Sequence, residues 1–547
     1  MKNRFATFCD RGGRVRPARG VGRCAGRRGF RVGWLAGAWA LGIVCAAGPA
    51  GAVDTVEVWW TGAVNGVVSN PANWAGDSLG VGTVASLGVN SILHCSADTI
   101  LYGPSSLGSH LGVNSLIYTT GTSVQTTGSG VFTLALGGGG IALSSSAADV
   151  SIGNASGANR IQLLLLENQV WSNYSALNTL TAINGVDNGG NVLTVGGVGR
   201  VTLAGVLSGS GGLAKTDSGT LRLLSSNTFT GGLTLNGGEV MLGSGALNAT
   251  AGSENRVVFG SGSTGMLSLS GASTVVASLD SNAGALGSPK VANFGDPATL
   301  TVGNALNLSS AFGGVIQNGI GSAPLGLSKE GTGRLTLSGA NTYTGVTAVE
   351  AGVLELADGG SILASGRVSI SGGTLLIQPA SSGDAIANPL PIRMESTSVG
   401  EVSTLKLGGA VLETMGALTL SGTVGKRVID FGAASGILRL ASLSGAEANT
   451  TLEVWNWTGS IYASGGVDQL IVDGGFGANM DLSQITFFSD AGQTALGPTA
   501  WATYYLGSTT GELVPIPEAG TMAGLLALLA PLAWKERKHW MRCRLAG

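Results

Sequence analysis

Side chains that could do acid–base or metal chemistry are few in this 547-residue chain, and they are widely spaced. The sequence contains three histidines, and only His94 and His110 lie outside the C-terminal tail. Histidine is the side chain that most often serves as a general base or metal ligand. His94 is followed by Cys95, but the central part of the chain offers these two soft ligands no further cysteine. A structural zinc site needs about four ligands, so the sequence predicts no metal site and no cofactor.

Aspartates are the remaining candidates, because enzymes that cleave polysaccharides can work with two carboxylates alone. Here they are scattered, and most stand beside or near glycine, serine or asparagine: Asp149, Asp187, Asp217, Asp280, Asp296, Asp358 and Asp384. Asp favours turns, where its side chain hydrogen-bonds to nearby backbone. The segment from Asp473 to Asn479 resembles a calcium-binding nonapeptide repeat, but it occurs once and so cannot stack on a copy of itself. We therefore expect turn residues, no catalytic site and no enzyme.

A repeat is the most informative pattern in the chain. Residues 326–356 read GLSKEGTGRLTLSGANTYTGVTAVEAGVLEL, and an earlier segment, residues 212–242, reads GLAKTDSGTLRLLSSNTFTGGLTLNGGEVML. The two segments align without a gap. They share a lysine, a segment of Asn-Thr-aromatic-Thr-Gly and paired leucines at the same places. A repeat at a fixed spacing indicates an array built from one supersecondary unit.

The repeated unit has the pattern of short strands separated by turns. Thr220-Leu221-Arg222-Leu223 alternates polar and apolar residues, which is the period of a half-buried strand. Glycine pairs separate this strand from the next ones, and glycine adopts backbone angles that other residues avoid. Leu221 precedes Val240 by nineteen positions, and Leu335 precedes Leu354 by the same step. We infer that this step is one coil of a parallel β-solenoid, with these side chains stacked inside.

These two segments resemble a known family. The pattern GLxKxGxGxLxLSGxNTYTGxT, followed by GxLxL, resembles the autotransporter-associated β-strand repeat of large bacterial surface proteins. The resemblance implies an all-β, right-handed parallel β-helix on the cell exterior, and it implies no chemistry.

Composition agrees with a long stack of short strands. The chain holds 93 glycines, 44% apolar residues and 11% charged residues, far from the usual share of about 7% glycine. Residues 1–52 carry ten Lys and Arg with one acid, and residues 535–547 carry five with one acid. The body between them is left with 14 basic residues and 29 acids. Such an acidic body argues against a nucleic-acid partner, which demands a basic face.

The N-terminal segment, residues 1–52, resembles a secretory signal peptide. Ten basic residues precede an apolar run from Val32 to Val44, and Ala50-Gly51-Ala52 supplies small residues for cleavage. We expect the mature chain to begin near Val53, with Ala50 and Ala52 at the cleavage site. The alternative is a retained N-terminal membrane anchor. After removal of both ends only Cys95 remains, so no internal disulfide is possible in the mature body.

Aromatic residues cluster at both ends of the predicted stack. Trp59, Trp60 and Trp74 open the mature chain in a pattern that is similar to the start of many proteins with this repeat. We expect them to cap the stack, whose open end would otherwise expose strand edges; the alternative is a platform for sugar stacking. From about residue 444 a second group should close the other end: Trp455, Trp457, Phe487 and Phe488.

The C-terminal segment, residues 514–547, resembles the PEP-CTERM sorting signal, which is an acidic proline motif, an apolar helix and a basic tail. Ala519 stands where that family has its second proline. The apolar run from Gly520 to Trp534 is shorter than the roughly 20 residues that span a bilayer. The resemblance implies processing by an exosortase-type enzyme; the alternative is a permanent anchor. The residues that carry it are Val514, Pro515, Pro517, Glu518, Lys535, Arg537, Lys538, Arg542 and Arg544.

These observations predict five segments: a signal peptide (1–52), an N-terminal cap and β-rich region (53–200), a solenoid with the repeats (201–443), a C-terminal cap (444–513) and a sorting tail (514–547). The predicted function is a secreted, non-enzymatic structural or adhesive protein of the cell surface or extracellular matrix. The alternative is a β-helix that binds or cleaves polysaccharide. The expected partners are the exosortase-type enzyme, exopolysaccharide or other surface proteins, and the membrane before processing.

The basic tail gives the first testable prediction. Positive residues next to an apolar segment favour the cytoplasmic side of a membrane. Replacing Lys535, Arg537, Lys538, Arg542 and Arg544 by Gln should therefore weaken this stop and misroute the body, as measured by the share of protein in a surface fraction. Unchanged surface delivery of the five-site variant would mean that the tail is a passive end.

Overall fold

The computed structural model describes residues 55–61, 67–76, 84–95, 105–106, 108–119, 123–125, 130–155, 160–243, 245–247, 255–282, 288–319, 321, 323–357, 359–378, 384–433, 435–448, 450–459, 466–503 and 510–515. The chain divides into residues 1–53 and residues 54–547, and everything described lies in the second unit. The predicted signal peptide and the predicted apolar helix at 520–534 lie outside the described residues.

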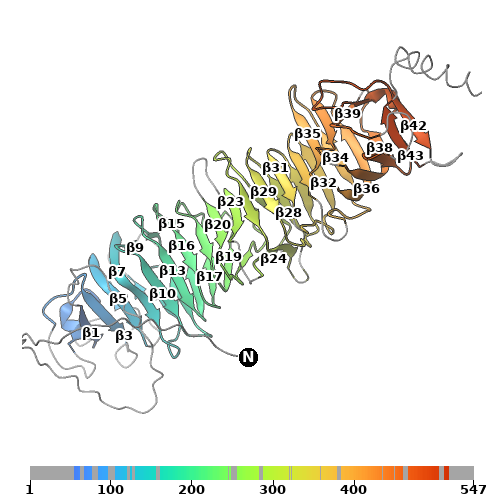
Figure 1. Ribbon diagram of the computed structural model, residues 1–547. Helices are drawn as coiled ribbons and strands as arrows, with labels where there is room; N and C mark the ends of the chain where they lie inside the picture. Colours follow the sequence, from blue (N-terminus) through green and yellow to red (C-terminus); the bar gives the residue numbers. More distant parts are fainter. Residues whose placement is uncertain are drawn as a thin grey trace, which may run out of the picture. The chain divides into compact units, whose positions relative to one another are not determined.

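The described residues are all-β, and their strands stack coil upon coil from β1 to β43 (Figure 1). Two 3-10 turns are the helical elements of the described residues, η1 (Pro71–Asn73) and η3 (Leu482–Gln484). The strands form four sheets. Apart from pairs at the two ends, neighbouring strands are parallel, which defines a parallel β-helix, as predicted.

The first two sheets make up the N-terminal part of the stack. Sheet 1 runs through β2 (Trp74–Ala75), β1 (Val56–Trp60), β3 (Ser91–Cys95), β5 (Leu111–Tyr118), β7 (Val131–Leu143), β10 (Gln169–Asn173), β13 (Leu193–Gly197), β16 (Leu213–Lys215), β18 (Leu233–Leu235), β20 (Arg256–Phe259) and β23 (Ser278–Ser281), with β9 (Arg160–Leu165), β12 (Val186–Asp187) and β15 (Leu207–Ser208) joined at its side. Sheet 2 runs through β4 (Ser105–Ser106), β6 (Ser123–Gln125), β8 (Val150–Ile152), β11 (Thr179–Ala182), β14 (Arg200–Leu203), β17 (Thr220–Leu223), β19 (Glu239–Leu242), β21 (Met266–Ser268), β24 (Lys290–Asn293) and β27 (Val315–Asn318).

The other two sheets make up the C-terminal part. Sheet 3 runs through β22 (Thr274–Val276), β25 (Ala298–Val302), β28 (Leu325–Lys329), β30 (Val346–Val349), β32 (Arg367–Ser371), β34 (Ile392–Glu395), β36 (Leu412–Ser421), β38 (Ile437–Gly445), β40 (Gln469–Val472), β43 (Gly511–Pro515) and β42 (Thr499–Thr503). Sheet 4 runs through β26 (Ser310–Phe312), β29 (Arg334–Leu337), β31 (Val353–Leu356), β33 (Thr374–Ile377), β35 (Val402–Leu407), β37 (Lys426–Asp430), β39 (Leu452–Trp455) and β41 (Ile485–Phe487).

The register of the repeats is the one that the leucine spacing predicts. Leu221 pairs with Val240, and Leu335 pairs with Leu354, so the predicted coil length is confirmed in both copies. All four side chains are fully buried, and they stack inside the coil because alternate residues of a strand point to opposite faces. Parallel pairing continues across residues 201 and 443, the predicted limits of the central segment, through β11–β14 and β38–β40.

The two copies of the repeat do not lie on the same faces of the stack. The first copy places its opening strand, β16, in sheet 1, whereas the second places its opening strand, β28, in sheet 3. The second strand of the later copy, β29, lies in sheet 4, and sheet 4 continues the column of sheet 1. The two columns join at β23 and β26, where the Asp280 and Ser281 side chains accept hydrogen bonds from backbone N–H groups of Ala311 and Gly313 at 3.1 and 2.8 Å. The motif is therefore displaced by one face between its copies.

Antiparallel strands end the stack at the N-terminal side. Trp60 pairs with Trp74 across the antiparallel β1–β2 pair, both are buried, and their rings meet edge to face with centroids 5.0 Å apart. The Trp74 indole N–H donates to the Val68 carbonyl at 2.8 Å. So short an antiparallel pair leaves little free edge for another chain to extend.

The C-terminal end has an equivalent arrangement. Sheet 3 ends in β43 and β42, which are antiparallel to their neighbours. Trp457 and Phe487 are buried below this end, with ring centroids 4.8 Å apart, and Phe431 packs on the other side of Trp457. Trp455 and Phe488 are only half-buried. In the described residues no helix is long and apolar enough to cross a membrane.

Stability of this stack should depend on its inner rows. Leu335→Ala would leave a cavity between β29 and β31, at a cost of about 2–5 kcal/mol. Because a solenoid opens locally, we expect faster amide hydrogen exchange in residues 334–337 and 353–356. Thr332→Ala, at an exposed position in the turn before β29, is the matched control. Equal exchange in both variants would contradict the stacked core.

Candidate functional site

The lysine shared by both repeats points into the stack. It binds backbone at a corner, which is the place where the chain passes from one sheet to the next. Lys215 is 1% exposed, and its Nζ donates to the carbonyls of Thr216 and Asp217. Lys329 is equally buried and donates to Glu330 and Gly331 at 2.5 and 2.8 Å. Burial lowers the pKa of each lysine to about 8, although a neighbouring carboxylate opposes the shift. These ammonium groups serve the turn and are not available to a ligand.

A glycine in the next coil makes room for this lysine. Gly238 has φ +65°, and a Cβ at that position would lie 2.7 Å from the Lys215 Nζ and 2.4 Å from the Asp217 carbonyl. Gly352 has φ +64° at the same place in the second copy. A left-handed backbone in so close an approach requires glycine. Lysine and glycine of the motif are therefore two parts of one corner.

The asparagine shared by both repeats holds the opposite corner. Asn341 Oδ1 accepts from Ile316 N at 2.9 Å, while its Nδ2 donates to the Gly339 and Ser361 carbonyls. Asn227 makes the same three bonds in the first copy, to Leu207 N and to the Ser225 and Ala246 carbonyls. Each asparagine thus links three successive coils. Both are almost fully buried, so their polar groups are used for packing.

The aspartates considered as catalytic candidates mostly bind backbone at corners. Asp149 accepts from Thr179 N at 2.7 Å, Asp187 from Gly189 N at 2.9 Å and Asp217 from Gly197 N at 2.8 Å. Asp280 accepts from Ala311 N, and Asp473 pairs with Arg439 at 2.6 Å. Asp358 lies outside the described residues. Across the described part of the chain, no three His, Cys, Asp or Glu side chains gather as a metal site.

His94 and Cys95 are separated by the pleat of β3. His94 faces outward and Cys95 is buried, because successive strand residues point to opposite faces. His94 stacks on Trp59 with ring centroids 4.6 Å apart, and its Nε2 lies 3.5 Å from the Glu57 carboxylate. Burial lowers the pKa of His94, with Glu57 opposing, and it raises the pKa of the Cys95 thiol to about 12. These two residues cannot share one metal ion.

The outward tryptophans offer little ring surface to a sugar. One face of Trp59 is covered by His94. Trp455 donates from its indole nitrogen to Glu453 at 2.7 Å, carries Lys426 Nζ 5.7 Å from its ring centroid, and lies so near Gly492 that a Cβ there would be 2.8 Å from the ring. Sugar stacking needs an open aromatic face, so neither ring is a ready platform.

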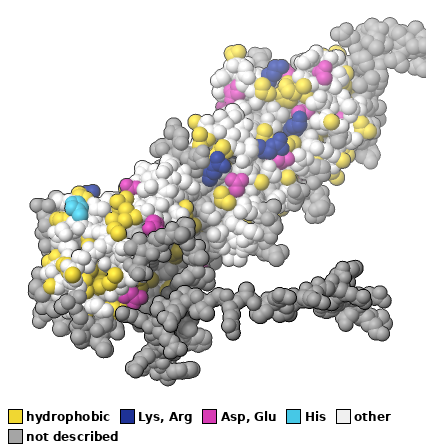
Figure 2. Space-filling view, turned by 60° about the vertical axis from the view of Figure 1, so that its left-hand side comes forward, with side chains coloured by type: hydrophobic (Ala, Val, Ile, Leu, Met, Phe, Trp, Pro, Cys, Tyr) yellow, Lys and Arg dark blue, Asp and Glu magenta, His cyan; other side chains and the backbone are white. Residues whose placement is uncertain are grey.

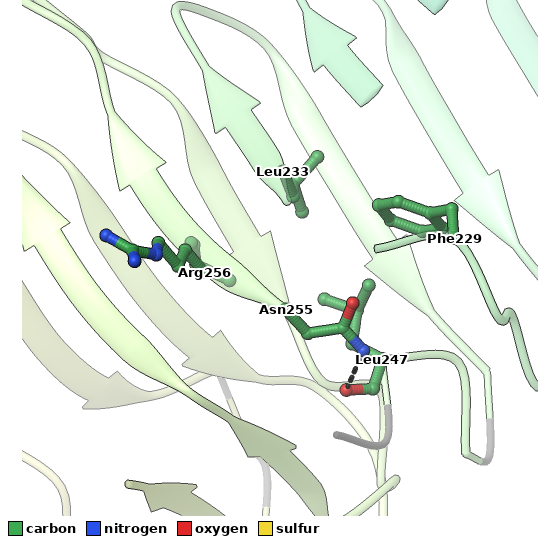
Figure 3. A pocket seen from close by; sticks show the side chains of 6 residues that line it. Phe229, Leu233, Leu247, Asn255 and Arg256 are labelled. Carbon is green, nitrogen blue, oxygen red and sulfur yellow. Dashed lines mark hydrogen bonds between the residues drawn. The ribbon is translucent and has the colours of Figure 1, made fainter. Parts of the chain in front are cut away.

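One hollow in the described surface is shown in Figure 3. Its apolar lining of Phe229, Leu233, Leu247 and Val257 is almost fully buried, and the space between these side chains is too small to hold a water molecule. The Asn255 amide donates to the Leu247 carbonyl at 3.4 Å, and the Arg256 guanidinium points away from the apolar side chains. No carboxylate lines this hollow, so it has no group for hydrolytic chemistry.

Ion pairs tie neighbouring coils in the C-terminal part. Figure 2 shows Lys and Arg side chains beside Asp and Glu over the middle and upper part of one face. Arg334 pairs with Glu355 at 2.8 Å and Lys406 with Asp430 at 2.6 Å, in both cases from one coil of sheet 4 to the next. In both pairs the carboxylate is buried and the basic group is partly exposed.

Most of the predicted sorting residues lie outside the described part of the chain. Val514 and Pro515 are described, and both are buried in β43, where they pair with Ala500 and Thr499. They belong to the strand that ends sheet 3. The predicted cleavage residues Ala50 and Ala52 and the rest of the tail are not described: Pro517, Glu518, Lys535, Arg537, Lys538, Arg542 and Arg544.

Sequence reasoning missed several buried charges, including Glu413 and Arg427. Glu413 is 1% exposed and accepts from Ala385 N at 3.0 Å and Ile386 N at 2.7 Å, so its carboxylate takes the place of a strand partner. Arg427 is equally buried and donates to the carbonyls of Gly422 and Thr451. Neither lies in a repeat copy, so no signal in the sequence singled them out.

The fold and the motif together define a β-solenoid with two copies of a transport-associated repeat. Residues 213–242 and 327–356 match the family described as the passenger-associated-transport-repeat, which agrees with the predicted repeats. The chain is also similar to the adhesin BmaC autotransporter of Brucella suis biovar 1 (strain 1330), with 30% identity over 241 residues. That match covers 41% of this chain and 7% of the adhesin, so the chain spans only a small part of this relative. No solved structure matches.

The buried Glu413 should make stability depend on pH. Burial raises its pKa to about 7, and the charge of Asp384 adds to this, against the two backbone N–H bonds. A carboxyl with a raised pKa stabilises the fold fully below about pH 4.5 and loses that contribution as pH rises through 7. The free energy of unfolding of Glu413→Gln, measured by thermal unfolding, should therefore rise relative to that of the parent between pH 5 and 8. The expected rise is on the order of 3 kcal/mol.

The control is Glu167→Gln, at an exposed position. The difference in free energy of unfolding between this variant and the parent should stay the same from pH 5 to pH 8. If the difference between Glu413→Gln and the parent is also independent of pH, then Glu413 does not titrate in this range.

Proposed function

We propose that this protein is a secreted, non-enzymatic surface protein whose solenoid acts as a structural and adhesive shaft. The observation that carries the proposal is the use of the motif itself. In both repeat copies the lysine and the asparagine are buried and bonded to corner backbone. Most of the candidate aspartates bind backbone as well. The polar residues that recur in this chain therefore build the stack.

Similarity to passenger repeats and to an adhesin supports a place outside the cell. We further propose that delivery follows the PEP-CTERM route, through the signal peptide at 1–52 and processing of the tail near Pro517 by an exosortase-type enzyme. Pro515 is the last residue of β43. Cleavage near Pro517 would therefore leave β43 complete, which supports processing at this place. The cell surface or the matrix is then the final location.

A polysaccharide-cleaving β-helix is the competing function. It would need a groove in which several acids converge. In the described residues these aspartates bind backbone at separate places on the stack, and the hollow at Phe229 carries no acid. Polysaccharide cleavage therefore has less support than the structural and adhesive function.

Two measurements on protein recovered from a surface fraction test the proposal. Mass spectrometry should find ends near Val53 and Pro517, and incubation with common polysaccharides should leave their chain length unchanged. An intact tail would indicate a permanent anchor. Reproducible cleavage that Asp280→Asn or Asp149→Asn abolishes would replace the proposal with the enzyme.

A further inference from the structure

Two arginines on the outer face of sheet 2 differ from the cations of the C-terminal part. Arg200 begins β14 and Arg222 lies in β17, on the next coil. Thr202 pairs with Arg222 and Arg200 pairs with Thr220, so the arginines are diagonal neighbours with Cα atoms about 8 Å apart. Inward neighbours such as Leu221 are fully buried, which places both arginines outward.

Neither arginine has a carboxylate partner among the described residues. The outward cations of sheets 3 and 4 differ in this, because five of them lie within 3.4 Å of a carboxylate: Arg334, Arg393, Lys406, Lys426 and Arg439. Arg222 makes no side-chain hydrogen bond or ion pair within the described part of the chain, and its Nε is buried without a partner. Two guanidinium groups so close together repel each other unless an anion lies between them.

One acid lies beside the pair. Glu239 follows Thr220 on the next coil, which makes it the diagonal neighbour of Arg222. Its carboxyl bonds to the Thr220 side chain, and the pKa of Glu239 is raised by burial against that bond and the charge of Arg200. One carboxyl cannot balance two guanidinium groups, so a net positive charge remains on this face for a ligand from solution.

The surroundings of the pair decide what kind of ligand fits. Thr179 and Thr181 occupy the same two outward rows on the preceding coil and are half-buried, whereas Thr202, in the row of Arg222, is only 6% exposed. Outward side chains in register on parallel strands form a flat face. A flat surface with hydroxyl groups and two guanidiniums suits an extended chain that carries carboxylates and hydroxyls. It does not suit a small molecule, which is normally enclosed.

We propose that Arg200 and Arg222 bind a carboxylate of an acidic polysaccharide that lies across β11, β14 and β17. The choice of a polysaccharide rests on the proposed surface function, whereas the anion site rests on the arginine pair alone. The two guanidiniums would hold one uronate carboxylate, and the hydroxyls of Thr179 and Thr181 would hydrogen-bond to sugar hydroxyls.

Binding of polygalacturonate by the full-length protein tests this, with dextran of similar length as the neutral probe. The double variant Arg200→Ser/Arg222→Ser should bind polygalacturonate roughly ten-fold or more weakly, because it loses charge-assisted hydrogen bonds. Arg160→Ser/Arg367→Ser should leave binding unchanged, since it removes the same charge from two other exposed arginines that have no ion-pair partner among the described residues. Arg200→Lys/Arg222→Lys should be intermediate, since lysine lacks the bidentate fork. Circular dichroism should show that all variants keep the strand signal.

Several outcomes would overturn the inference. Equal loss in the two serine double variants would mean general charge attraction, and no loss in either would remove the site. Equal binding of dextran, or of DNA in place of polygalacturonate, would remove the assignment to an acidic polysaccharide. If the protein shortens polygalacturonate while binding still depends on Arg200 and Arg222, the arginine site stands and the non-enzymatic function fails.

Discussion

Hydrogen bonding at the corners is the constraint on which this stack depends. Along each face the backbone N–H and C=O groups pair with the coils above and below, but at a corner the chain leaves the ladder and those groups lose their partners. A buried polar group without a partner costs about 1–3 kcal/mol, and every coil has corners. Interior side chains offset this cost: in each repeat copy an asparagine, Asn227 or Asn341, binds backbone at one corner and a lysine, Lys215 or Lys329, at another. In the C-terminal part Glu413 and Arg427 also bind backbone groups from inside the stack.

The strand register could be predicted from the sequence because it depends on a local pattern. Leucine spacing inside two similar segments indicates the coil length directly, and Leu221 with Val240 lies where that spacing requires. The roles of Lys215 and Asn227 could not be inferred in the same way. Lysine and asparagine are usually exposed, so a pattern that contains them suggests a surface site. Only the folded structure shows that both side chains point inward, where backbone carbonyls accept their hydrogen bonds.

The candidate site was less predictable than the fold for a related reason. A turn aspartate and a catalytic aspartate look alike in sequence. The prediction of turns holds at Asp217 and is wrong at Asp187 and Asp280, which lie in strands β12 and β23. The arginine pair gave no sequence signal, because Arg200 and Arg222 belong to different strands and meet only through the coil register. What distinguishes them is that two arginines without an ion pair among the described residues lie diagonally across neighbouring coils, and this arrangement appears only when the coils are stacked.

The displacement of the repeat by one face affects what a partner protein could recognise. The aromatic corner of the first copy, at Phe229, and that of the second, at Tyr343, are different edges of the same prism. A receptor or an antibody that contacts the loop beside one copy could not slide along the shaft and find the same loop on the same side. Two similar segments of sequence thus give two separate epitopes with different orientations. The chain would engage a bivalent partner only if that partner could reach around it.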